Sequence, residues 1–179
     1  MMKRFLIGLV ILAGLWLYNG GYADLTGGAS AGGGDPVQEF ASGDAKMNAA
    51  MDQARATLPA FLANETDANG NAAPNTSVKV AFDIGNDGAE IIWVSQFQWD
   101  GGTQMNGLLS NQSNYMDGLN AGDAVAFTTD MVRDWSITEA NGRMWGNYTT
   151  RVIVPQLDAE TAAALGAMLS PDPVPSDWN

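Results

Sequence analysis

The sequence predicts an α+β domain in which a strongly twisted or barrel-like, mostly antiparallel sheet of five or six strands is covered by an N-terminal amphipathic helix. Apolar residues recur at three- and four-residue steps after Asp44, as on one face of a helix. From Ser77 onward, alternating apolar and polar residues are separated by Asn/Gly turns, which is typical of hairpins. A second helical pattern after Asp158 adds a C-terminal helix.

The N-terminus is typical of an export signal. Lys3 and Arg4 precede the apolar run Phe5–Leu17, and Gly21-Tyr22-Ala23 has the small residues that signal peptidase requires. We therefore predict cleavage after Ala23, which makes 1–23 a signal peptide and places the protein in the periplasm or outside the cell, with no membrane contact after cleavage. A retained N-terminal anchor is the alternative. A lipid anchor is excluded because the chain has no cysteine.

A glycine-rich segment separates this signal from the domain. Residues 24–43 include GGASAGGGD and lack apolar periodicity, so they are predicted to be a flexible linker. Asp44 then caps the first helix. The predicted buried stripe consists of Met47, Met51, Ala54, Leu58, Phe61 and Leu62. Because Pro59 lacks an N–H group, we expect the helix to break or kink near Leu58.

The sheet is predicted from five segments and their turns. Asn86-Asp87-Gly88 joins the first two strands, and Asn141-Gly142 is the strongest hairpin signal in the chain. The predicted strands are Ser77–Ile84, Glu90–Trp99, Gln104–Ser110, Ala124–Thr128, and Trp135–Thr138 paired with Arg143–Val154. Asp158 caps a last helix, Ala159–Leu169. The domain is thus predicted to span 44–170, followed by a proline-rich tail, 171–179.

Three segments together resemble a known bacterial family. They are DAVAFTTDMVRDWSITEANGRMWGNYTTRV (123–152), EIIWVSQF (90–97) and GLLSN (107–111), and they resemble the domain-of-unknown-function family 2314 (DUF2314). The positions that match the family pattern, as structural or binding candidates, are Trp93, Asp134, Trp135, Gly146, Tyr148, Thr149 and Arg151. The resemblance implies no catalytic residue. We further expect an Asp134–Arg151 contact to tie two strands together.

Charge and composition limit the partners. The formal charge is −12, and removal of Lys3 and Arg4 would lower it to −14. The remaining Lys and Arg residues are scattered, so neither nucleic acid nor anionic lipid is an expected partner. With no His and no Cys, the chain lacks the usual general base near neutral pH, the thiol nucleophile and the common zinc ligands. We predict no cofactor and no metal.

Three weak patterns remain as candidate sites. Asp130 and Asp134 are four residues apart and would share one side of a helical turn, as an acid and base pair does, although an exposed acidic turn explains them equally. Ser77 and Lys79 would share one strand face as a dyad. Glu65–Gly70 resembles the first half of a calcium loop, but the twelfth position is Thr76 rather than the bidentate Glu.

Two function classes follow. The leading prediction is a non-enzymatic module of the cell envelope that binds an unknown protein, peptide or envelope component through an acidic, aromatic-lined sheet. The alternative is a carboxylate-dependent hydrolase or carbohydrate-active enzyme that uses Asp130 and Asp134 or another pair of carboxylates. The five aromatic residues predicted on the sheet are expected in the core, with a ligand groove as the alternative.

Overall fold

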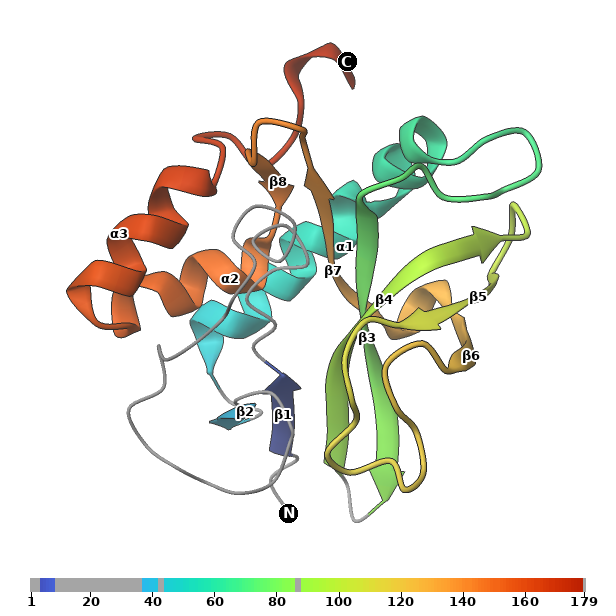
Figure 1. Cartoon of the computed structure of the whole chain (residues 1–179), viewed down its shortest axis with the longest axis horizontal. Helices are drawn as coiled ribbons and strands as arrows, with labels where there is room; N and C mark the ends of the chain where they lie inside the picture. Colours follow the sequence, from blue (N-terminus) through green and yellow to red (C-terminus); the bar gives the residue numbers. More distant parts are fainter. Residues whose placement is uncertain (1–3, 9–36, 42–43, 86–87, 179) are drawn as a thin grey trace.

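The computed structural model describes residues 4–8, 37–41, 44–85 and 88–178. These residues form an α+β domain (Figure 1). The strands are β1 (Arg4–Gly8), β2 (Val37–Ala41), β3 (Thr76–Gly85), β4 (Gly88–Trp99), β5 (Gln104–Leu109), β6 (Ala124–Thr128), β7 (Val132–Thr138) and β8 (Met144–Gly146). The helices are α1 (Ala45–Glu65), α2 (Tyr148–Ile153) and α3 (Ala159–Met168). The predicted fold class is confirmed.

Six strands form an open antiparallel sheet in the order β6, β5, β4, β3, β7, β8. The sheet twists strongly but does not close, with β5 and β6 at one end and α2 and α3 beyond the other (Figure 1). The β3–β4 hairpin has the predicted partners, and residues 86 and 87 of its turn lie outside the described residues.

Two further strands extend this sheet. β1 pairs in parallel with Gly88–Ile91 of β4, and β2 pairs antiparallel with β1. β1 falls in the predicted signal peptide and β2 in the predicted linker, while most of residues 1–43 lie outside the described residues. Cleavage after Ala23 stays a prediction; it would remove β1 and with it the partner of this stretch of β4.

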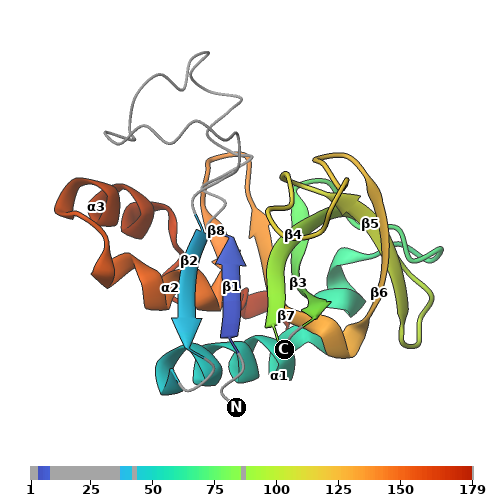
Figure 2. The ribbon, with the colours of Figure 1, turned by 90° about the horizontal axis from the view of Figure 1, so that it is seen from below.

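Helix α1 forms where its sequence predicts and covers one face of the sheet (Figure 2). The Asp44 carboxylate accepts the N–H groups of Lys46 and Met47, each at 2.9 Å, which caps the helix. All six predicted stripe residues are buried, and Ala50 joins them. Five of them share one apolar cluster with residues of β3 and β4, including Val78 and Ile92, and with Trp135 of β7. Met47 and Met51 belong to a second cluster with Ala81, Ile91 and Ile153.

The predicted break near Leu58 is wrong, because α1 continues through Pro59 to Glu65; the alternative of a kink there stays a prediction. Pro59 removes the hydrogen bond to the carbonyl of Arg55, and both residues are exposed, so water can solvate that carbonyl. The residues on the other side of the helix, Leu58, Phe61 and Leu62, are buried in the core. Their packing keeps the helix continuous at the proline.

The last hairpin is shorter than predicted. Its second strand ends at Gly146, and the residues predicted to continue it form α2 instead. Gly146 has φ +68° and Asn147 has φ +54°, a left-handed pair that turns the chain from strand to helix. The β-branched residues Thr149, Thr150, Val152 and Ile153 favoured a strand locally, but tertiary contacts to β7 decide for the helix.

The C-terminal segment packs on the domain. Asp158 caps α3 through a 3.0 Å bond from the N–H of Thr161, as predicted. Beyond it, the carbonyl of Pro173 accepts the N–H of Gly146 at 2.7 Å. The Trp178 ring lies with its centroid 5.4 Å from that of Trp135, so the predicted tail is part of the packed structure.

Candidate functional site

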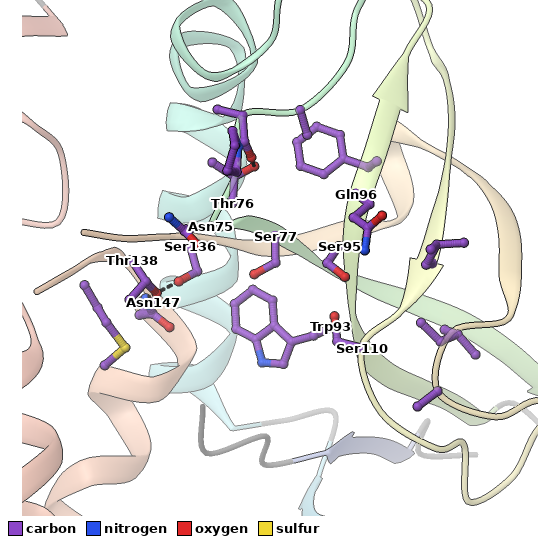
Figure 3. A pocket seen from close by; sticks show the side chains of 18 of the residues that line it. Asn75, Thr76, Ser77, Trp93, Ser95, Gln96, Ser110, Ser136, Thr138 and Asn147 are labelled. Carbon is purple, nitrogen blue, oxygen red and sulfur yellow. Dashed lines mark hydrogen bonds between the residues drawn. The ribbon is translucent and has the colours of Figure 1, made fainter. Parts of the chain in front are cut away.

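The candidate site is a groove of about 750 Å³ that crosses the sheet on the face opposite most of α1 (Figure 3). Its floor comes from β3, β4 and β7, and its sides come from β5, β8, α2, α3 and two loops. Hydroxyl and amide side chains mix there with apolar ones. The hydroxyl and amide lining consists of Asn71, Asn75, Thr76, Ser77, Ser95, Gln96, Ser110, Ser136, Thr138, Asn147 and Thr150. None of the described lining residues is charged.

A row of three serines forms the floor of this groove. Ser77 on β3 lies directly opposite Ser136 on β7 and Ser95 on β4. Strand alternation points all three toward the groove, and adjacent strands set them about 4.8 Å apart. In the described part of the chain, the hydroxyls of Ser77 and Ser95 bond to no other residue, while Ser136 accepts the Asn147 amide at 2.8 Å. The floor therefore offers free donors and acceptors.

Backbone strain is concentrated around the groove. Among the described residues, the non-glycine positions with positive φ are Asn75, Gln96 and Asn147, and all three line it. Gln96 lies at a register shift between β4 and β5, which is a β-bulge. Such conformations cost free energy and cluster at functional sites. Here they bring three side-chain amides to the groove, as Figure 3 shows.

Next to the serine row lies a buried polar row, Asp134, Lys79 and Trp93, also paired directly across β7, β3 and β4. The Thr149 hydroxyl of α2 joins two of them. It accepts a hydrogen bond from Lys79 Nζ at 3.1 Å and donates one to Asp134 Oδ2 at 2.6 Å. Lys79 Nζ also lies 5.0 Å from the ring centroid of Trp93, within cation–π range. This row separates the groove floor from the second apolar cluster, which contains Ala81 and Ile91.

The Asp134 carboxylate anchors α2 to β7. It accepts the N–H groups of Trp135, Tyr148 and Thr149 at 2.9, 3.0 and 2.7 Å, in addition to the Thr149 hydroxyl. The carboxylate accepts in all four bonds, which favours its ionised form. Burial raises the pKa of Asp134, and the charge of Lys79 opposes this rise. Burial lowers the pKa of Lys79 to about 8, and the charge of Asp134 opposes that fall.

The family-motif aromatics lie mainly in the core. Trp135 is fully buried and stacks on Phe61 with centroids 4.9 Å apart, while its Nε1 donates to the Thr57 hydroxyl at 2.9 Å. That hydroxyl also bonds the Tyr148 hydroxyl at 3.1 Å, so α1 holds both aromatic residues. Trp93 is buried as well, but it borders the groove.

Gly146 and Arg151 shape the turn into α2. A Cβ on Gly146 would lie 2.2 Å from the Trp135 carbonyl oxygen, so only glycine fits this close approach. Arg151 donates from Nε to the Gly146 carbonyl at 3.0 Å and from Nη1 to the Ser170 carbonyl at 2.8 Å. The expected Asp134–Arg151 pairing of two strands is wrong, because Arg151 lies on α2 and donates to carbonyls, while Asp134 accepts from Thr149 and backbone N–H groups. The two residues interact through their charges alone.

The predicted carboxylate pair does not form a site. Asp130 is exposed in the short 3₁₀ helix Thr129–Met131, whereas Asp134 is buried on β7, so the two do not share a helical turn. The Ser77/Lys79 side chains share a sheet face, as expected, but Lys79 is bonded to Thr149 and Ser77 opens to the groove. At the calcium-like loop, the Asp67 carboxylate accepts the N–H groups of Asn69 and Asn71, which uses it as a turn cap.

The sequence analysis did not predict most of the residues that line the groove. Ser77, Ser95 and Ser136 lie on predicted or observed strands, but their alignment depends on the β3–β4 and β3–β7 registers, which no local motif specifies. No sequence pattern marked Asn75 or Gln96 as site residues. What distinguishes them is a positive φ, which is known only once the backbone is folded. Of the seven family-pattern residues, Trp93 alone lines the groove, and the other six form the framework beside it. Ser77, which the sequence analysis named only as half of a dyad with Lys79, lines the groove as well.

Comparison with known proteins adds the family. The family described as "uncharacterized protein conserved in bacteria (DUF2314)" matches residues 44–166, more than half of the chain. No curated protein and no solved structure matches the chain. Among the described residues, no helix combines the length and apolar character needed to span a bilayer.

Proposed function

The chain belongs to the bacterial DUF2314 family, and we propose that it is a non-enzymatic, exported binding module of the cell envelope that holds an uncharged ligand in its groove. The carrying observation is the groove lining, in which hydroxyl, amide and apolar side chains meet without a charged one although the chain has a formal charge of −12. Mixed apolar and polar linings of this volume are typical of ligand sites.

Two features favour binding over a purely structural groove. The floor hydroxyls of Ser77 and Ser95 are unsatisfied by other described residues, so a ligand can replace water on them. Three residues hold strained backbone conformations around the same cavity. Backbone conformations of this kind cluster at functional sites.

The hydrolase alternative has lost the pair that supported it. Glycoside hydrolysis needs two carboxyl groups that flank a cleft. Asp134 is buried with four donors on its carboxylate, Asp130 is exposed, and neither lines the groove. No general acid or base from the described lining residues faces the groove, which favours binding without chemistry.

Fragment screening by NMR tests this proposal. The full chain is mixed with uncharged fragments that carry amide and hydroxyl groups, and with matched fragments that carry a carboxylate or an amine. We expect uncharged fragments to shift the amide signals of Ser77, Ser95 and Ser136, charged ones to shift them less, and every fragment to be recovered unchanged. Absence of any fragment-induced shift at these residues, or conversion of a fragment, would contradict the proposal.

A further inference from the structure

We infer that the occupant of the groove is an extended, uncharged peptide segment of about six residues, bound mainly through its backbone. This inference rests on the proposed binding function and specifies the ligand. It is carried by the direction of the groove, the kinds of side chain that line it, and the low exposure of its aromatic rings.

The direction and length of the groove suit an extended chain. The lining residues come successively from β5, β4, β3, β7 and β8, so the groove crosses the strands rather than following one of them. Four spacings of about 4.8 Å give a length of roughly 19 Å. An extended peptide rises about 3.3 Å per residue, so about six residues fill it.

The polar groups of the groove match a peptide backbone. Asn75 and Gln96 each bring a carbonyl and an NH₂ group, which can accept from an N–H and donate to a C=O of the same ligand residue. The NH₂ of Asn147 already donates to the Ser136 hydroxyl and the Trp145 carbonyl, so this residue offers the groove its side-chain carbonyl. The floor hydroxyls act as donor or acceptor by rotation. Because the described lining has no charge, a Lys, Arg, Asp or Glu side chain of the ligand would lose hydration without gaining a partner.

A saccharide fits less well. Sugar rings present apolar faces that pack on exposed aromatic rings, but Trp93 is 6% exposed and Phe97 is 1% exposed. Among the described large hydrophobic residues, Tyr115 is the exposed one at 46%, and it does not line the groove. The groove therefore offers side-chain amides and hydroxyls but little aromatic platform.

The test titrates the full chain with pooled hexapeptides that are acetylated and amidated and contain only uncharged residues. Three comparison probes are used: the same pool with a central Lys or Glu, the same pool N-methylated at alternate backbone nitrogens, and maltohexaose. We expect the uncharged pool to bind, a central charge to weaken binding roughly tenfold, and N-methylation to weaken it by a similar factor, because N-methylation removes backbone donors.

Two substitutions locate the contact without disturbing the backbone. Glycine accepts positive φ, so Asn75→Gly and Gln96→Gly remove an amide from the groove while preserving the local conformation. Each should weaken peptide binding about three- to tenfold. Gln104→Ala, an exposed change on β5 outside the groove, is the matched control and should leave the affinity unchanged.

The outcomes separate this inference from the proposed function. Binding of maltohexaose or of uncharged fragments at the groove, with no peptide binding, would overturn the peptide inference and leave the binding function standing. Peptide binding unaffected by both glycine substitutions would also overturn it, because the contact would lie elsewhere. Absence of peptide, saccharide and fragment binding alike would overturn the inference and the proposed function together.

Discussion

Asp134 joins three parts of the domain through one carboxylate, because its donors come from β7, the start of α2 and a hydroxyl that also contacts Lys79. In Asp134→Asn, the side-chain NH₂ would face N–H and O–H donors, and Lys79 would lose its counter-charge. We expect a loss of about 3 to 5 kcal/mol in the free energy of unfolding, measured by urea denaturation. Asp130→Asn, an exposed control, should leave the free energy of unfolding nearly unchanged.

The buried Lys79 amine should make the free energy of unfolding depend on pH. Its folded pKa is about 8, below the ordinary value of 10.5, so between these pH values the unfolded chain binds more protons than the folded one. The free energy of unfolding therefore rises with pH across this window, by up to about 1.4 kcal/mol per pH unit.

The measurement compares urea unfolding at pH 8 and pH 10 for the wild type and for Lys79→Met, which removes the titrating amine and keeps an unbranched apolar side chain of nearly the same length. Subtraction of the two slopes isolates Lys79 from tyrosines and other lysines. An equal slope in both proteins would show that Lys79 keeps an ordinary pKa in the folded state.

At the scale of elements, the turn from β8 into α2 depends on one glycine. A Cβ at Gly146 meets the Trp135 carbonyl and ring, and φ is +68°. Gly146→Ala should destabilise the domain by roughly 3 kcal/mol or more, lowering the thermal midpoint. Gly142→Ala also has positive φ, +85°, but nothing lies within 4 Å of its Cβ, so it should cost only about 1 kcal/mol. Similar midpoints for both variants would show that the close approach at Gly146 is unimportant.

The same elements show what local sequence can and cannot predict. Helix α1 was predictable because its cap and its apolar stripe are both local, and strands β3 to β6 follow from alternation and turns. Strands β1 and β2 were not predicted, because they fall in the segments assigned to the signal peptide and the linker. Helix α2 could not be predicted from local sequence. The N–H groups at its start are satisfied by Asp134, which lies on β7, 14 residues before Tyr148. Pro59 was misjudged for a related reason: burial of Phe61 and Leu62 outweighs the local preference.

At the scale of the whole molecule, the N-terminal region makes a prediction about processing. Lys3, Arg4 and the apolar run that follows favour export with cleavage after Ala23. Mass spectrometry of the protein from its own cells should give a mature chain that begins at Asp24, recovered in the periplasmic or extracellular fraction. A chain that retains Phe5–Leu17 and sediments with membranes would instead support the anchored alternative.

The candidate site belongs to this largest scale, because no single element contains it. Ser77, Ser95 and Ser136 become one row only when β3, β4 and β7 pair in the observed registers. The residues that match the family pattern therefore mark the framework around the groove more than the groove itself. Trp93 is the position common to both.

The central claim is that the groove binds an uncharged ligand through its floor hydroxyls. Calorimetric titration of the full chain with the uncharged fragment that gives the largest NMR shifts tests this most directly. The wild type is compared with a Ser77→Ala and Ser95→Ala double variant and with Thr103→Ala, which changes an exposed hydroxyl outside the groove. We predict about tenfold weaker binding for the double variant alone; equal affinity in all three proteins would contradict the assignment of the groove.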